Sequence, residues 1–345
     1  MKVLSLIIFF VFFISCNSSQ VNDKPRDDSC KKNIDCPSYN FCIDKKCKDY
    51  SSNDFSSIEE LKTLSLSNFI IMSDNKGDSI EDKRFENMVN WAKDFSASFV
   101  IGLGDHLKIN YENQFLGFLE KNEFWFNNFY PSIADGENEY YGESQADWGA
   151  GGKFLEFLKF SNRSNTILEA NKVEYYSKFK AEDLTIHLIQ LHFPDQPLDD
   201  KIAWPQSSRD YLIKTIKSIN KSKNDIIIVG AHSIFGRWYQ YLSEDEFKVV
   251  IENVDLGLSA TSHIFEKYKI ESYENKGTLF LNTGAVSRPR FPNGEGFVYV
   301  FVLDNPNRIV LQYLDPRKPS IEFDTRYPLY IKNIAGTIEE KIIKN

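Results

Sequence analysis

Six residues of metal-binding types stand at the ends of apolar runs: Asp74, Asp105, Glu137, His192, His232 and His263. Each lies just past such a run or on its last residue. In open α/β sheets, ligands bind beyond the carboxyl ends of the strands, so these side chains are expected to converge. Imidazoles and carboxylates together are the ligand set for divalent transition metals. The pattern therefore predicts a metal site at one edge of a sheet.

The elements that must position these residues alternate along the chain from Asn68 onward. Helical periodicity predicts helices at about 82–95, 113–126, 207–220 and 243–252. Apolar runs predict strands at 69–72, 98–103, 130–134, 173–180, 184–193, 226–229, 254–259, 278–281, 297–303 and 309–314. Strands that alternate with helices favour an α/β fold with a largely mixed sheet.

The polar motifs follow one another in a recognisable order. They are Asp74-Asn75-Lys76, Gly104-Asp105, Gly136-Glu137-Asn138-Glu139, His232 and Ala260-Thr261-Ser262-His263. This order resembles the calcineurin-like metallophosphoesterases, whose motifs read D-x-H, G-D, G-N-H-E, a lone His and G-H-x-H. The similarity spans about 68–304 and includes the stretch VDLGLSATSHIFEK. It implies an α/β/β/α sandwich of mixed sheets.

The resemblance also implies a chemistry. Two divalent metal ions (Fe, Mn or Zn) would clamp a small phosphate ester and activate a water for in-line attack. Asp105 would bridge the two metals. Asp74 and His263 would bind the first metal, and Glu137 and His232 the second.

Three positions depart from the family pattern. Lys76 and Thr261 stand where the family has metal-binding histidines, and Asn138 replaces the histidine that assists the leaving group. Asn donates a hydrogen bond but is no general acid, and Lys76 suits contact with a phosphate as a point charge. Both are kept as candidate catalytic residues. Two functions are therefore predicted as alternatives. One is a phosphoesterase, and the other is a surface binding protein with the same fold that no longer hydrolyses anything.

Other polar residues near these motifs are secondary candidates. His192 ends a strand and is predicted to supply a missing ligand, and His106 is an alternative to it. Strand alternation places His192 on the face opposite His187, which is expected to be structural. Arg237 follows His232 and is a candidate contact for the substrate.

The N-terminus predicts export. Lys2 precedes an apolar run, 3–14, that is shorter than the roughly 20 residues of a membrane span. The run ends at Phe13-Ile14-Ser15-Cys16, which resembles a bacterial lipobox and implies lipid attachment at Cys16. The prediction is an exported protein anchored to the cell envelope and its membrane through this lipid. A plain signal peptide with secretion is the alternative.

Four further cysteines are confined to a short segment: Cys30, Cys36, Cys42 and Cys47. In an exported chain they are expected to form two disulfides, for which three connectivities are possible. A zinc site is the competing interpretation, and it is disfavoured because tight C-x2-C pairs are missing.

The whole chain divides into six predicted segments. These are a signal peptide (1–15), a tether (16–29), the Cys-rich segment (30–48), a linker (49–66), the phosphoesterase-like domain (67–325) and a C-terminal tail (326–345). The net charge of −8 disfavours a nucleic-acid partner, because binding to a phosphate backbone requires clustered Lys and Arg. Nothing in the sequence points to a protein partner.

Overall fold

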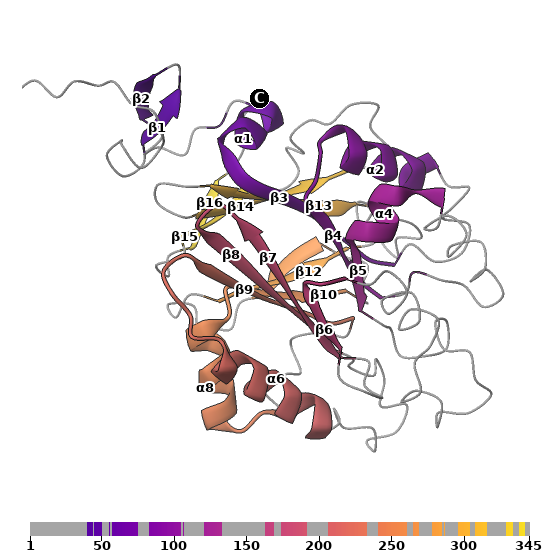
Figure 1. The fold of residues 1–345 in the computed structure, drawn as a ribbon, viewed down its shortest axis with the longest axis vertical. Coiled ribbons are helices and arrows are strands. Elements are labelled where there is room, and N and C mark those ends of the chain that lie inside the picture. The colour runs from indigo at the N-terminus through magenta and orange to yellow at the C-terminus, as the bar shows by residue number, and fades with distance from the viewer. Residues whose placement is uncertain are drawn as a thin grey trace, which may run out of the picture.

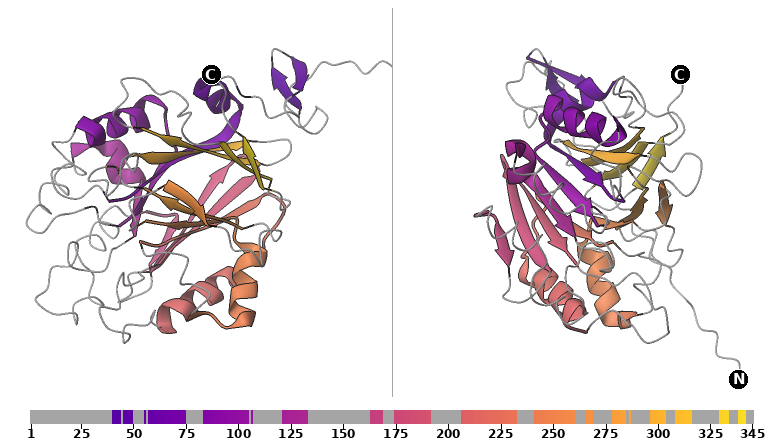
Figure 2. Two further views of the ribbon diagram at one scale, coloured as in Figure 1. Left: turned by 180° about the vertical axis from the view of Figure 1, so that it is seen from behind. Right: turned by 90° about the vertical axis from the view of Figure 1, so that its right-hand side faces the viewer.

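The structure is a computed structural model. It describes residues 40–43, 45–49, 55, 57–74, 83–104, 106, 121–132, 163–168, 174–191, 206–232, 241–260, 265–268, 278–284, 286, 296–303, 308–315, 329–333 and 338–341. Two mixed sheets are stacked face to face, with helices on both outer faces (Figures 1 and 2). The predicted α/β/β/α sandwich is confirmed.

The first sheet, called sheet I here, has the strand order β16-β15-β14-β13-β3-β4-β5. Strands β3, β4 and β5 run parallel, and the other pairs are antiparallel. The bounds are β3 Ser65–Met72, β4 Phe99–Leu103, β5 Phe129–Ser132, β13 Phe297–Leu303, β14 Arg308–Leu314, β15 Leu329–Asn333 and β16 Ile338–Lys341.

The second sheet, sheet II, has the order β11-β12-β10-β9-β8-β7-β6. Here β8, β9, β10 and β12 run parallel, while β6, β7 and β11 are antiparallel to their neighbours. The bounds are β6 Thr166–Leu168, β7 Tyr175–Ala181, β8 Leu184–Gln190, β9 Asp225–Gly230, β10 Leu256–Ser259, β11 Phe265–Tyr268 and β12 Leu279–Thr283.

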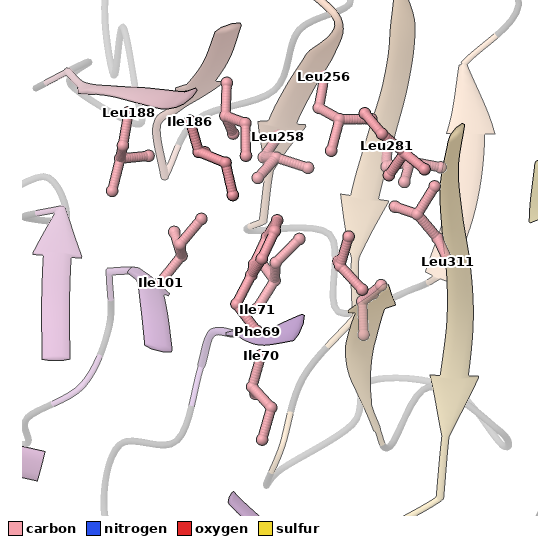
Figure 3. Close-up of a cluster of buried hydrophobic side chains, with 14 of the residues drawn as sticks. Phe69, Ile70, Ile71, Ile101, Ile186, Leu188, Leu256, Leu258, Leu281 and Leu311 are labelled. Carbon is pink, nitrogen blue, oxygen red and sulfur yellow. The ribbon is translucent and has the colours of Figure 1, made fainter. Parts of the chain in front are cut away.

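Apolar side chains fill the space between the sheets (Figure 3). Phe69 and Ile71 of sheet I are fully buried there, as are Leu188, Leu258 and Leu281 of sheet II, which approach from the other side. Burial of apolar surface is the main favourable term in folding, so this layer holds the two sheets together.

The helices cover the outer faces. On the side of sheet I lie α1 (Ile58–Leu64), α2 (Lys83–Asp94) and α4 (Glu123–Asn128), and on the side of sheet II lie α6 (Gln206–Ser218) and α8 (Glu244–Asn253) (Figure 1). The α8 helix begins with a capping box, in which the Ser243 hydroxyl accepts from the Glu246 amide and Glu246 returns a bond to Ser243. Helix α2 turns Met88 and Ala92 inward, as its periodicity predicted.

One segment departs from the predicted divisions. Residues 326–345 were expected to be a tail, yet β15 pairs with β14 and β16 pairs with β15, so both strands extend sheet I. The linker at 49–66 was expected to have some helical character, and it contains α1, whose Ile58, Leu61 and Leu64 are buried. The helix predicted at 113–126 overlaps α4, which spans Glu123–Asn128. Its predicted first half falls on residues 107–120, which lie outside the described part of the chain.

Within the Cys-rich segment, β1 (Asn40–Ile43) and β2 (Lys46–Asp49) form a hairpin in which Cys42 pairs across from Cys47. Cys47 is disulfide-bonded. The two-disulfide pattern of the four cysteines stays a prediction, and the predicted signal peptide and Cys16 lie outside the described residues. Among the helices that are described, none has the length and apolar character needed to span a membrane.

Candidate functional site

The carboxyl ends of the parallel strands of both sheets meet at one edge of the sandwich, called the junction edge here. Just past the strand ends, the Asp74 amide donates to the Gly104 carbonyl at 3.2 Å, which joins β3 to β4. The Val286 amide donates to the Ser73 carbonyl at 3.0 Å, which joins sheet II to sheet I. The convergence predicted from strand ends is therefore present for these segments.

Asp74 lies at the centre of this edge. It follows β3 directly, its side chain is buried, and its backbone has a φ of 50°. A positive φ is uncommon for a residue other than glycine, and it persists only where the surroundings enforce it. The flanking bonds at the Asp74 amide and the Ser73 carbonyl supply that restraint.

Ser73 ties the two sheets together beside Asp74. Its hydroxyl donates to the Gly284 carbonyl at 2.5 Å and lies 3.2 Å from the Thr283 hydroxyl. The Thr283 hydroxyl lies 3.3 Å from the Ser259 carbonyl, to which it donates. This chain of hydroxyls links the ends of β3, β12 and β10, so the position of Asp74 depends on both sheets.

His232 follows β9 and is buried against sheet I. Its Nδ1 lies 2.6 Å from the Leu103 carbonyl at the end of β4. A carbonyl only accepts, so Nδ1 carries the proton and the lone pair is on Nε2. Metal-binding histidines commonly have this arrangement, in which one ring nitrogen donates to a backbone carbonyl and so fixes the tautomer.

Gly104 makes room for this imidazole. A Cβ at position 104 would lie 2.8 Å from Nδ1 of His232 and 2.9 Å from its Cβ. The backbone φ of +85° at Gly104 also favours glycine. The close approach of His232 and the positive φ therefore explain why a glycine occupies position 104 in the Gly104-Asp105 motif.

His106 is a second buried imidazole at the same edge, and it is neutral. Its pKa is lowered from 6.5 to about 3, mainly by burial and to a smaller extent by His232, while Asp74 opposes the shift. Its Nε2 accepts a hydrogen bond from the Gly104 amide at 3.0 Å, so its other nitrogen carries the ring proton. In this conformation neither nitrogen offers a lone pair to a cation, and His106 is not favoured as a replacement ligand.

Gln190 crosses between the sheets two residues before His192. Its Nε2 donates to the Gly102 carbonyl at 3.1 Å and to the Tyr130 carbonyl at 2.8 Å. The side chain is buried, and it joins the end of β8 to β4 and β5. The sequence interpretation missed this residue, because nothing local distinguishes it from other polar residues on a strand.

The structure thus brings together two of the predicted ligands, Asp74 and His232, since they bond to the adjacent residues Gly104 and Leu103 at the end of β4. The other predicted site residues lie outside the described residues: Lys76, Asp105, Glu137, Asn138, His192, Arg237 and His263. Within the described part of the chain, no three His, Cys, Asp or Glu side chains form a group that could hold a metal ion. The assignments of those seven residues remain predictions.

Glycines and hydroxyls at strand ends were also missed by the sequence interpretation. A Cβ at Gly102 would lie 2.4 Å from Nε2 of His106, and Ser73 holds the turn that carries Asp74. The spacing Gly102-Leu103-Gly104 at a strand end is the signal that could have indicated a close approach by side chains.

Comparisons with known proteins give structural likenesses only. No protein-family model matches the chain, and no curated protein does either. Similar solved structures include a dimetal phosphatase from Danio rerio, with a TM-score of 0.45 and 10% identity over 78% of this chain and 99% of the other. A phosphatase from Mycoplasma pneumoniae has a TM-score of 0.41 and 12% identity over 75% and 95%, respectively.

A 5′-nucleotidase from Candida albicans is also similar, with a TM-score of 0.42 and 13% identity. The likeness covers 74% of this chain and 52% of the nucleotidase. These structural neighbours are phosphatases and phosphoesterases. The strand orders and registers described above define the fold of this chain.

Proposed function

We propose that this protein is an exported, metal-dependent phosphoesterase that hydrolyses a small phosphate ester at the junction edge. The observation that carries the proposal is His232, which is buried, held by the Leu103 carbonyl and oriented with its lone pair on Nε2. An imidazole that serves only packing has no need of this tautomer at the point where the parallel strands of two sheets end.

The chemistry of the donor set fits a divalent cation. Asp74 is fully buried, and a buried carboxylate is stabilised by an opposing charge. Asp74 and His232 are held at the same strand end, because the Asp74 amide bonds to Gly104 and the His232 imidazole bonds to the adjacent Leu103. Oxygen and imidazole nitrogen donors suit Zn, Fe and Mn.

The order of motifs along the chain extends this donor set. Asp74 and His263 would hold one cation, Glu137 and His232 the other, and Asp105 would be shared between them, with His192 as a further ligand. Two cations would place positive charge against the phosphoryl oxygens and lower the pKa of the attacking water. Lys76 would contact the phosphate, Asn138 would donate a hydrogen bond to the leaving oxygen, and Arg237 would bind the rest of the substrate.

Three replaced positions favour a second candidate function, a binding protein without hydrolytic activity. Lys76 and Thr261 remove two imidazoles, and Asn138 removes a general acid. Metal content and turnover separate the two functions, because the binding protein would show no hydrolysis even where it retains a cation.

The test is a metal analysis of the purified chain paired with hydrolysis of p-nitrophenyl phosphate, after separate incubation with Zn²⁺, Mn²⁺ and Fe²⁺. We expect bound metal and hydrolysis in the native chain. Both should fall at least about tenfold in His232→Ala, the range seen when metal-site residues are lost. His187→Ala is the matched control, since it removes another buried histidine of sheet II that lies away from the junction edge.

Two results would count against the proposal. A native chain that takes up no metal and hydrolyses nothing would refute the enzyme. Equal loss in His232→Ala and His187→Ala would show that general destabilisation, rather than the site, explains the loss. Asp74→Asn, which keeps the shape of the side chain, provides a second variant if His232→Ala does not fold.

Export and anchoring are part of the proposal and are supported by 1–20 of the sequence. Acyl chains contribute about 0.8 kcal/mol per buried CH₂, so Cys16→Ser should lose lipid labelling and leave the membrane fraction. Membrane association that persists in Cys16→Ser, without lipid labelling, would contradict the lipid anchor.

A further inference from the structure

A pocket lies on the outer face of sheet II, between strands β6 to β8 and helix α6. Its volume is about 500 Å³, within the size range of small-molecule sites. His187 of β8 lines it, whereas Gln190 of the same strand reaches between the sheets to the junction edge. Because side chains alternate along a strand, the pocket opens on the opposite face of sheet II from the junction edge.

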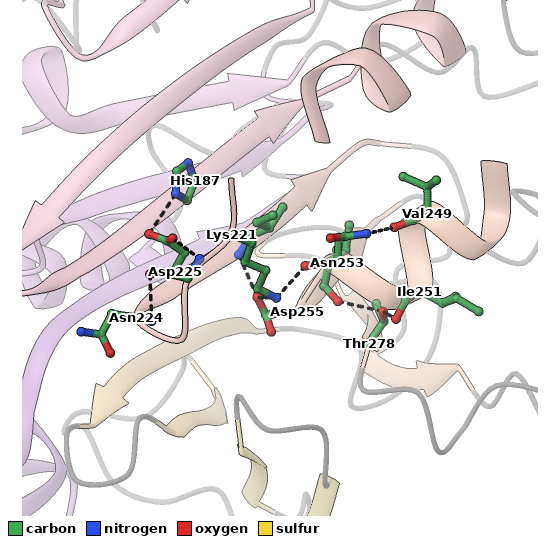
Figure 4. Close-up of polar contacts among 12 residues, drawn as sticks. His187, Lys221, Asn224, Asp225, Val249, Ile251, Asn253, Asp255 and Thr278 are labelled. Carbon is green, nitrogen blue, oxygen red and sulfur yellow. Dashed lines mark hydrogen bonds and ion pairs between the residues drawn. The ribbon is translucent and has the colours of Figure 1, made fainter. Parts of the chain in front are cut away.

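Three of the lining side chains form a hydrogen-bonded chain. His187 Nε2 lies 3.3 Å from Asp225 Oδ1, a contact drawn in Figure 4, and His187 Nδ1 lies 2.7 Å from the Tyr176 hydroxyl. An ionised carboxylate only accepts, so Nε2 carries the proton and Nδ1 accepts from the Tyr176 hydroxyl in the neutral imidazole. Asp225 thus fixes the tautomer of His187, and His187 fixes the orientation of the Tyr176 hydroxyl.

The charge that faces the pocket is positive. Lys178 of β7 and Lys214 of α6 both line it. Neighbouring groups hydrogen-bond to the Asp225 carboxylate: its Oδ2 accepts from the Ser222 amide at 2.6 Å, and its Oδ1 accepts from His187. Helix α6 ends beside the pocket, and its C-terminus contributes a partial negative charge of about half a unit. Two ammonium groups outweigh that partial charge and the Asp225 carboxylate together, so the pocket keeps a small positive charge.

The remaining lining is polar at the end of α6 and apolar at the rim. Asn220 offers an amide, the Ser218 hydroxyl donates to the Thr215 carbonyl and can accept from a ligand, and Ile167 at the edge strand β6 is 62% exposed. A bare phosphate or sulfate would fill only a fraction of this volume. A ligand that matches the lining carries an anionic group together with a body that bears several hydroxyls.

We propose that this pocket is a second ligand site, which binds a small polyhydroxylated oxyanion, with Lys178 and Lys214 meeting the anionic group and Tyr176 bonding to it. The anionic group is a phosphate ester or a carboxylate, since both present the same oxygens to an ammonium and a hydroxyl. The site needs no metal and does not depend on the activity proposed for the junction edge.

Binding of the anion is coupled to a proton. With neutral His187, the Tyr176 proton points at Nδ1, so the hydroxyl has no proton to give a ligand. When His187 gains a proton, both ring nitrogens donate, and the Tyr176 proton turns toward the pocket. Burial is the main factor that opposes a charge on His187, and Lys178 and Lys221 oppose it as well. Asp225 favours the charge, and a bound anion would favour it too.

The groups around His187 come from every element packed beside it. Lys214 and the buried Tyr211 line the pocket from α6, Lys178 lies on β7, and Asp225 begins β9. Because the His187 ring contacts both Asp225 and the Tyr176 hydroxyl, proton uptake that depends on Tyr176 distinguishes the built site from loose attraction to surface lysines.

The test uses the full chain as His232→Ala, which removes hydrolysis at the junction edge. Glucose 6-phosphate and gluconate are titrated separately by calorimetry near neutral pH, in two buffers of different ionisation enthalpy. We expect saturable binding of at least one probe, with proton uptake that disappears in Tyr176→Phe. Lys178→Met and Lys214→Met should each weaken binding by about threefold, the size expected for an exposed charge contact.

Lys180→Met and Lys217→Met are the matched controls. Both lysines are exposed on the same strand or helix as the tested pair, and both lie outside the lining of the pocket. The proposal is overturned if neither probe binds at millimolar concentration, or if the control variants weaken binding as much as the pocket variants. A stronger response to glucose 6-phosphate identifies a phosphate-ester ligand, and a stronger response to gluconate identifies a carboxylate.

Discussion

At the junction edge, polar side chains bond to the backbone of the other sheet, whereas at the opposite edge of sheet II they bond within their own sheet and its loops. His232 and Gln190 reach the carbonyls of β4 and β5. At the opposite edge, Lys221, Asp225 and Asp255 contact neighbouring loops and strand starts of sheet II (Figure 4).

The two edges also differ in the partners of their buried charged groups. At the opposite edge, called the amino-terminal edge here because the parallel strands of sheet II begin there, the Asp255 carboxylate meets the Lys221 ammonium at 2.8 Å and accepts from the Ile227 amide at 2.9 Å. The charges there are matched inside the protein. At the junction edge, His106 is a neutral imidazole, and Asp74 is a buried carboxylate placed beside it.

This difference suggests that the amino-terminal edge contributes mainly to stability and the junction edge mainly to function. A matched ion pair at strand starts fixes loops and requires no ligand. Side chains held by the backbone of two sheets are positioned by the whole fold, and substitutions there should affect function more than stability. The predictions below break or sharpen that contrast.

The largest effect on stability is expected at the amino-terminal edge. Asp255→Ala leaves the Lys221 ammonium and the Ile227 amide without their shared acceptor, so it should lower the free energy of unfolding by about 3 kcal/mol. Urea unfolding followed by tryptophan fluorescence measures this, and the metal content of the folded chain should not change.

Asp255→Asn is the control for this change, because it keeps an acceptor for the Ile227 amide and removes only the charge. Its loss of stability should be smaller than that of Asp255→Ala. A loss below about 1 kcal/mol in Asp255→Ala, the level of a surface ion pair, would show that the two edges do not differ in this way.

An intermediate effect is expected from Gly104→Ala at the junction edge. The positive φ costs about 1–2 kcal/mol for a residue with a Cβ. The new Cβ would also lie within 2.8 Å of Nδ1 of His232, so the imidazole must shift. We expect a loss of about 2 kcal/mol in unfolding free energy and at least about tenfold weaker metal retention.

Gly284→Ala separates the two contributions. Gly284 also has a positive φ, 70°, and its carbonyl accepts from Ser73 rather than from a histidine. It should lose similar stability and keep more metal than Gly104→Ala. Equal metal retention in both variants would mean that the close approach to His232 has no functional consequence.

Much of the fold could be predicted from apolar runs, because strands buried on both faces leave a continuous signal. Strand β13 has the predicted bounds, 297–303, and every one of its residues is buried. Strands β15 and β16 were missed because LYIKN and IEEK mix charged with apolar residues and give no such run. Pairing of β15 with β14 and of β16 with β15 determines those strands, and pairing is not a local property of the sequence.

The candidate site was predictable in part for the same reason. Asp74 and His232 stand out because they follow strand signals directly. The roles of Gln190 and Gly102 depend on contact between residues 88 positions apart, which no local pattern encodes. His187 was predicted to be structural from strand alternation alone, and the pocket beside it exists only because α6 packs across β7 and β8.

The smallest effect is expected from the pH dependence of His187, which lies beside the amino-terminal edge. Burial lowers its pKa below 6.5, and Lys178 and Lys221 act in the same direction against Asp225. Below pH 6.5 the unfolded chain therefore binds a proton that the folded chain resists, so stability falls as the pH drops toward the folded pKa. The slope is at most about 1.4 kcal/mol per pH unit for one proton.

His187→Gln should reduce this slope between about pH 7.5 and pH 5, in urea unfolding of the metal-free chain, while the remaining histidines contribute equally to both curves. The pKa of Asp225 is lowered from 3.8, so its own contribution is lost only at more acid pH and leaves this window clear. Parallel curves for the native chain and His187→Gln would show that His187 titrates alike in the folded and unfolded states, which would contradict the effect of burial on its pKa.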